Sequence, residues 1–147
     1  GWLVVNQATR PGHRLSTKIR YFHGSGGGGI VTRGEINLTR ALEMYEDFEV
    51  FAMGHIHENK CTNVARDTIE HNPACGWFSK QKQIHLMITG TYKEEFGDGS
   101  KGWHVERGAP IKPIGSRILI IDTKRVVDKK NNTDRAEKLI DSIKFPL

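Results

Sequence analysis

This 147-residue sequence lacks long hydrophobic runs, a leader-like start and more than two cysteines. No apolar stretch approaches the ~18 residues of a membrane-spanning helix, so we expect no transmembrane segment. The first residues do not combine a basic start with a long apolar stretch, so we expect no signal peptide. Cys61 and Cys75 match no zinc-binding spacing and cannot build a disulfide framework, which favours a reducing, cytoplasmic location.

The composition is that of one folded domain with an excess of basic residues. Hydrophobic residues make up 37% and charged residues 27%, enough to build one modest core over residues 1–147. The formal net charge of +5 suits an anionic partner such as a phosphate group or nucleic acid. An ordinary basic protein has the same charge, so charge alone does not identify the partner.

The amino terminus is unusual. The chain starts with Gly1 and enters an apolar run at Trp2, whereas natural amino termini are more often polar and loosely packed. We therefore expect a domain truncated at its amino terminus, with a sheet face or edge left open. Such an edge tends to pair with another chain. The expected partners are the missing amino-terminal segment or a second copy of the chain.

The first half of the sequence predicts a β–α–β unit. Residues 18–23 are rich in aromatic and β-branched types and predict a strand, which a glycine-rich loop at 24–29 follows. Residues 35–45 have helical spacing of apolar side chains, and residues 48–53 predict a short buried strand. Since a helical crossover favours parallel pairing, we expect the two strands to be parallel neighbours.

The second half predicts antiparallel strands and a helical tail. Residues 60–70, 82–92 and 116–123 have strand composition and are separated by turn-rich stretches. The fold class expected is therefore α/β (α+β) with a mixed sheet. Residues 125–147 predict a basic, helical tail, because apolar residues recur at helical spacing after a capping residue. These residues are Ala136, Leu139, Ile140 and Ile143, with Asn132 or Thr133 as the cap.

Three histidines follow the two predicted parallel strands. His23 ends the first strand, and Gly54 with His55, Ile56 and His57 follows the second. In an extended segment His55 and His57 would point to the same side. Parallel strands place ligands at their carboxyl ends, so we expect His23, His55 and His57 to converge there. Imidazole nitrogens bind zinc, iron, manganese or nickel, so this cluster predicts a metal site.

The remaining histidines and the glycine run give weaker signals. The glycine run lacks the Gly-Lys-Ser or Gly-Lys-Thr of a phosphate loop and is interpreted as a flexible lip beside His23 or a plain linker. His13 lies in a polar stretch, His71 precedes a turn-forming Asn-Pro and is expected in a loop, and His85 is expected to be packed within a strand. His104, in a loop-rich region, could approach the site.

The chain resembles the carboxyl-terminal half of a calcineurin-like metallophosphoesterase, phage and bacterial members in particular. The resemblance rests on His23-Gly24 at a strand end, on Gly54-His55-Ile56-His57 after the next strand, and on the stretch at 88–92. It covers about residues 18–122. It implies a β-sandwich flanked by helices that hydrolyses phosphoesters at a site with two metal ions.

The resemblance also assigns roles to individual residues. His23 and His55 would bind one metal ion and His57 the other, and the ions could be Mn, Zn, Fe or Ni. Gly24, Gly54 and His104 would lie near the phosphoester substrate. A two-metal site places its ions ~3.5–4 Å apart, on either side of the reacting phosphate.

Several ligand motifs of that family are missing from this sequence. It contains no Asp-x-His and no Asn-His, and its one Gly-Asp pair, Gly97-Asp98, lies in a late loop. We therefore expect the site to be incomplete and the chain to be inactive alone. Two alternatives stay open: a non-catalytic module that binds nucleic acid or another anion through its basic face, and a structural α/β domain whose histidines are incidental.

Overall fold

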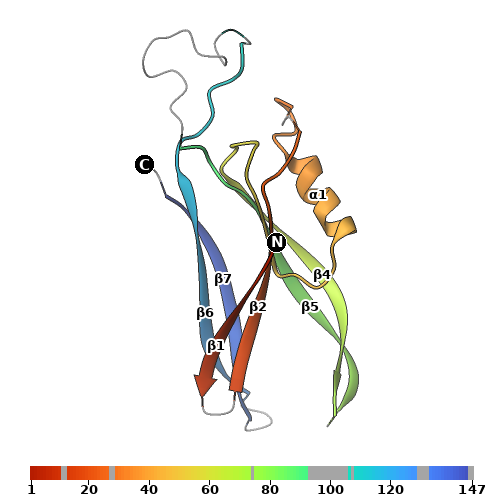
Figure 1. The fold of residues 1–147 in the computed structure, drawn as a ribbon. Helices are drawn as coiled ribbons and strands as arrows, with labels where there is room; N and C mark the ends of the chain where they lie inside the picture. Colours follow the sequence, from red (N-terminus) through yellow and green to blue (C-terminus); the bar gives the residue numbers. More distant parts are fainter. Residues whose placement is uncertain are drawn as a thin grey trace.

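The computed structural model describes residues 1–10, 13–26, 29–73, 75–92, 106, 108–128 and 133–145. This part of the chain is mostly β-sheet and contains one helix (Figure 1). The elements are β1 (Trp2–Arg10), β2 (His13–Phe22), α1 (Glu35–Met44), β3 (Val50–Met53), β4 (Lys60–Asn72), β5 (Gly76–Ile88), β6 (Ser116–Asp128) and β7 (Thr133–Phe145). No helix among these residues is long and apolar enough to cross a membrane.

The main sheet is mixed, as the sequence predicts. Its five strands lie in the order β1-β2-β3-β5-β4. β2, β3 and β5 are parallel, while β1 and β4 pair antiparallel with β2 and β5 at the two edges. The predicted unit is confirmed: β2 and β3 are parallel neighbours, Phe22 lies opposite Met53, and α1 connects the two strands.

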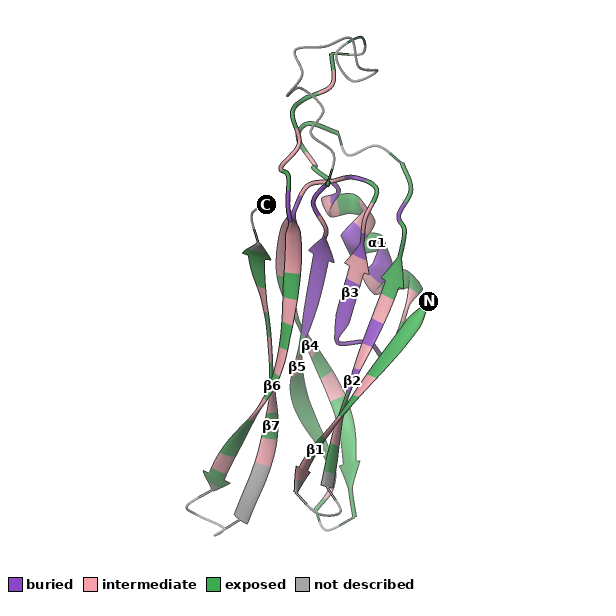
Figure 2. Ribbon diagram, turned by 60° about the vertical axis from the view of Figure 1, so that its left-hand side comes forward, coloured by how far each residue is buried: buried purple, intermediate pink, exposed green. Residues whose placement is uncertain are grey.

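The sheet is covered by α1 on one face and by the β6–β7 hairpin on the other (Figure 2). β3 is buried on both faces, which explains why its sequence is apolar without alternation. Phe51 and Met53 pack in the cluster with Leu38 and Ala41 of α1. Val50 packs in the opposite cluster with Ile19 and Met87, and hairpin residues such as Ile140 contact that cluster.

The predicted helical tail is wrong, because residues 133–145 form β7 and pair antiparallel with β6 along its whole length. Ile140 contacts the core, whereas Leu139 and Ile143 are about half exposed. The apolar residues that suggest a helical stripe therefore divide between two faces with a period of two. Pairing with the apolar β6 outweighs the local helical spacing. Asn132, one of the two proposed caps, lies outside the described residues.

The antiparallel strands of the second half are confirmed, although their bounds differ. β4 and β5 are each 13 residues long and form a hairpin from Lys60 to Ile88. β5 starts earlier than expected and ends at Ile88, after which Thr91 forms one bridge with Ile114. In Figure 2 the buried part of β5 lies near β3, whereas the distal ends of β4 and β5 are exposed. The core is thus concentrated at the carboxyl ends of β3 and β5.

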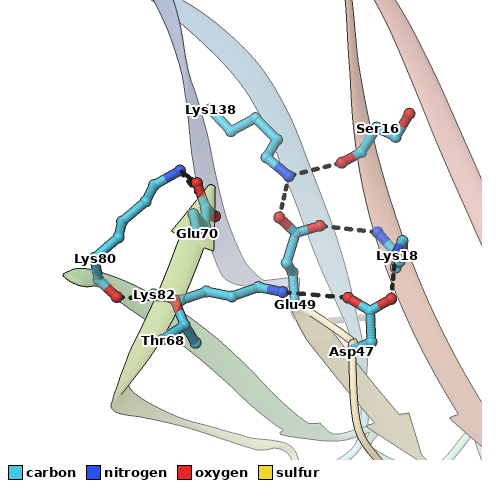
Figure 3. A network of polar contacts seen from close by, with 9 residues as sticks. All are labelled: Ser16, Lys18, Asp47, Glu49, Thr68, Glu70, Lys80, Lys82 and Lys138. Carbon is cyan, nitrogen blue, oxygen red and sulfur yellow. Dashed lines mark hydrogen bonds and ion pairs between the residues drawn. The ribbon is translucent and has the colours of Figure 1, made fainter. Parts of the chain in front are cut away.

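A buried carboxylate ties the hairpin to the sheet (Figure 3). Glu49, which is 8% exposed, precedes β3 and accepts a 2.9 Å hydrogen bond from the backbone N–H of Lys18. Its other carboxylate oxygen forms an ion pair with the ammonium group of Lys138 on β7. The same ammonium group donates a 2.6 Å hydrogen bond to the carbonyl oxygen of Ser16. Lys138 thus connects the hairpin to both β2 and the start of β3.

Candidate functional site

The candidate site lies at the carboxyl ends of the parallel strands, where the segments after β2, β3 and β5 leave the same end of the sheet (Figure 1). His23 follows β2, and Gly54 and His55 follow β3. The backbone N–H of Gly54 donates a 3.1 Å hydrogen bond to the carbonyl oxygen of His23, so pairing continues one step beyond the strands. This bond holds the two histidine segments side by side.

The imidazoles of His23 and His55 meet directly. Nδ1 of His55 lies 3.3 Å from Nε2 of His23, and the ring centroids are 5.3 Å apart at an interplanar angle of 70°. Both residues are exposed. The two nitrogens are within hydrogen-bonding distance, and the tautomers of the rings decide which one is the donor. The expectation that His23 and His55 lie together is therefore met.

Gly24 makes this close approach possible. It is buried and has a φ of 98°, in the region that favours glycine. A Cβ at this position would lie 2.8 Å from the carbonyl oxygen of Gly54 and 3.0 Å from Cβ of His55. Any side chain here would push the His23 and His55 segments apart. The first glycine of the glycine run thus has a specific role, while residues 27–28 of that run lie outside the described residues.

The segment that contains His55 and His57 is not extended, and the expectation that it is extended is wrong. The φ angles are 64° at His55, 61° at His57 and 41° at Asn59. Three non-glycine residues in the left-handed region within five positions represent local backbone strain, which is typical of functional sites. The alternation of side chains in a strand therefore does not apply to His55 and His57.

The expected cluster of three histidines is not found in the described part of the chain. No group of three or more His, Cys, Asp or Glu side chains is arranged there to hold a metal ion. His57 is half-buried and follows Ile56, whose side chain is buried in the core beneath the loop. The structure thus brings together His23 and His55 and leaves His57 outside a three-ligand group.

The other histidines are placed as follows. His85 is packed in β5 as expected, and it is 4% exposed. Burial lowers its pKa, and the nearby carboxylates of Asp141 and Glu49 oppose that shift. His71 was expected in a loop, but it lies in β4 and packs against Trp77, with ring centroids 4.9 Å apart. His13 starts β2. His104 and the Gly97-Asp98 pair lie outside the described residues.

Two polar residues near the strand ends are not indicated by any sequence motif. Thr89 follows β5, and its hydroxyl oxygen would lie 3.4 Å from a Cβ built on Gly54. Asn59 is 7% exposed, and its side-chain amide makes no hydrogen bond within the described residues. The positions of Thr89 and Asn59 depend on the sheet topology, because the carboxyl ends of the parallel strands share one edge of the sheet. Recognising β5 as the third parallel strand is the signal that could have found Thr89.

The distance between the two ring nitrogens fits a shared metal ion. Nitrogens bound to one zinc ion at ~2.0–2.1 Å with tetrahedral angles lie about 3.3 Å from each other. The nitrogen atoms of His23 and His55 are 3.3 Å apart. Their hydrogen bond would be replaced by two bonds to the ion, with both rings neutral. The pair supplies two ligands, so water or other protein groups would complete the coordination.

Comparisons with family models, with curated proteins and with solved structures found no match to this chain. The chemistry of the site is therefore inferred from the residues of this chain. Those residues offer two imidazole nitrogens at the exposed carboxyl ends of the parallel strands β2 and β3.

Proposed function

We propose that this chain is the carboxyl-terminal half of a metal-dependent phosphoesterase with two metal ions in its complete site. The observation that carries the proposal is the pair formed by His23 and His55, whose nitrogen atoms are 3.3 Å apart at the ends of adjacent parallel strands. Exposed imidazoles held at the ends of adjacent strands are suited to bind a divalent ion that must also reach a substrate. Zinc, manganese, iron and nickel all accept such ligands.

Each site residue has a part in this proposal. His23 and His55 hold one ion, and His57 contributes to the second ion together with ligands that this chain does not supply. Gly24 and Gly54 keep the backbone compact beside the pair. Divalent ions bound there supply positive charge that stabilises the phosphoryl group during hydrolysis. The net charge of +5 favours the approach of a phosphoester from the cytoplasm, including one within nucleic acid.

The chain alone is expected to bind metal without catalysing turnover. The sequence has no Asp-x-His or Asn-His motif, so carboxylate ligands and a further histidine would have to come from outside these 147 residues. Without a second positioned ion, the leaving oxygen lacks support. Restoring an upstream segment with those motifs is expected to restore hydrolysis.

Zinc titration calorimetry on the chain and its variants tests the proposal. We expect weak binding of one ion, a loss of at least tenfold in affinity for His55→Ala, and a smaller loss for His57→Ala. His71→Ala is the matched control, because His71 is also exposed but packs against Trp77. Unchanged affinity in His55→Ala would rule out the metal site.

A hydrolysis assay tests whether the chain holds an incomplete site or the complete site of an enzyme. The wild-type chain is incubated with bis(4-nitrophenyl) phosphate and Mn²⁺, and no hydrolysis above the metal alone is expected. Full turnover that His55→Ala abolishes would show that the chain holds a complete site. Metal-independent binding of an oligonucleotide, together with the absence of zinc binding, would favour the anion-binding alternative.

A further inference from the structure

β1 is an open edge of the main sheet. It is nine residues long and pairs only with β2, so its other side has no strand partner among the described residues. An unpaired edge offers a row of backbone N–H and C=O groups to another strand. The register with β2 is irregular between Ala8 and Arg10, so the regular part of the edge ends near Ala8.

Residues 2–9 of β1 carry no charged side chain that would oppose such pairing. Trp2, Leu3 and Val4 are 51%, 52% and 49% exposed, and no residue from 2 to 9 carries a charge. Trp2 and Val4 lie on one face of the sheet, and Leu3 and Val5 lie on the other. The start of β1 is therefore apolar on both faces.

The strand at the opposite edge of the sheet, β4, carries features that oppose pairing with another chain. β4 carries charged side chains at Arg66, Asp67 and Glu70, and Ile69 is its one large exposed apolar residue within the described part. Charges along an edge strand oppose pairing with a further chain. The contrast makes β1, rather than β4, the edge that accepts a partner.

We propose that β1 pairs antiparallel with β1 of a second copy of this chain, which joins the two sheets across a two-fold axis. A second copy fits because the strand is neutral from residue 2 to 9, so self-pairing places no like charges opposite each other. Arg10 ends β1 beyond its regular part, and Lys18 and Arg20 lie one strand further back on β2. A highly charged peptide would find no complementary charge on residues 2–9 of β1.

The two-fold axis limits the register. An axis perpendicular to the sheet brings like faces together, so even-numbered residues oppose even-numbered ones. With Val4 opposite Val4 of the second copy, Leu3 faces Val5 and Trp2 faces Asn6. This register pairs the apolar residues 3–5 with the same residues of the second copy. It also leaves Gln7 free to keep its 2.8 Å hydrogen bond to the carbonyl oxygen of Ile121 in the hairpin.

Sedimentation equilibrium of the full chain tests the proposal, which does not depend on metal binding. We expect a dimer mass for the wild type and a monomer mass for Val4→Lys, because two ammonium groups would then lie opposite each other. The control Ile69→Lys, on the β4 edge where Ile69 is 72% exposed, is expected to stay dimeric. Mixing Val4→Lys with Val4→Glu is expected to restore the dimer mass.

A wild-type chain that sediments as a monomer at every concentration overturns the proposal. So does a Val4→Lys chain that stays dimeric while Ile69→Lys dissociates. If circular dichroism shows that Val4→Lys does not fold, hydrogen exchange of the wild type decides instead. Amides of residues 2–6 that exchange more slowly as concentration rises support the dimer, and exchange that is independent of concentration overturns it.

Discussion

The ammonium group of Lys138 on β7 binds the carboxylate of Glu49 at the start of β3. This ion pair joins two segments that are far apart in the sequence and locks the hairpin onto the sheet that carries the candidate site (Figure 3). The side chain of Glu49 is 11% exposed and that of Lys138 is 23% exposed. Solvent therefore screens the pair only in part.

Replacing Lys138 by Met is expected to lower the free energy of unfolding by about 2 kcal/mol. The substitution keeps the length of the side chain but leaves the Glu49 carboxylate buried without its cation. The expected loss is smaller than for a fully buried pair, because water reaches Lys138. Urea denaturation measures it.

Lys80→Met is the matched control for that substitution. Lys80 pairs with Glu70 at 2.9 Å on the surface, where the two side chains are 55% and 46% exposed. A change within about 0.5 kcal/mol is expected there. Equal losses in the two variants would contradict a special role for the Glu49–Lys138 pair.

The stability of the chain is expected to fall in mild acid because of His85. Burial lowers the pKa of His85 in the folded chain below its ordinary value of 6.5. The unfolded chain therefore binds a proton at a higher pH than the folded chain does, and acid favours unfolding. The contribution of neutral His85 to the free energy of unfolding is complete above pH ~6.5. It declines as the pH falls from there toward the lower pKa of His85 in the folded chain.

His85→Gln removes this titration and is expected to flatten the decline. Urea denaturation of wild type and variant at a series of pH values between neutral and mildly acidic isolates the effect, because other titrating groups are common to both chains. A constant difference in stability across the series would show that His85 does not titrate within it.

Gly24→Ala is expected to destabilise the chain and weaken zinc binding together. The new methyl group would lie 2.8 Å from the carbonyl oxygen of Gly54. The alanine would also have to adopt the φ of 98° that favours glycine. We expect a loss of about 3 kcal/mol, from backbone strain and from the clash. Thermal unfolding and zinc calorimetry measure the two effects.

Gly26→Ala is the control that separates the effect of backbone strain from that of the close contact with Gly54. Gly26 also has a positive φ, of 79°, but a Cβ there would meet nothing within 4 Å. It is expected to cost about 1 kcal/mol and to leave zinc affinity unchanged. If both variants lose zinc affinity equally, Gly24 does not position the histidine pair by close packing.

The sequence contains the information for the centre of the fold because local pattern and topology agree there. The short strands ending near His23 and Met53 flank a helical period, and the crossover rule then makes them parallel neighbours. That placement is enough to bring His23 and His55 to one edge. The packing of His85 follows in the same way from its apolar neighbours in a strand.

Other features depend on tertiary contacts that a local pattern does not contain. The apolar spacing around Ile140 fits a helix, but β6 supplies a partner over 13 register pairs and the segment becomes a strand. The left-handed backbone at His55 and His57 has no sequence signal comparable to a glycine. The position of His57 therefore could not be derived from the alternation of side chains expected in a strand.

The central claim is that His23 and His55 bind one metal ion through the nitrogens that face each other. Long-range ¹H–¹⁵N NMR spectra of the histidine rings, recorded during a zinc titration at neutral pH, test it most directly. We expect Nε2 of His23 and Nδ1 of His55 to shift together, with saturation at one equivalent, while the rings of His71 and His85 stay unchanged. Zinc-induced shifts that bypass His23 and His55, or shift only one of them, would contradict the shared site.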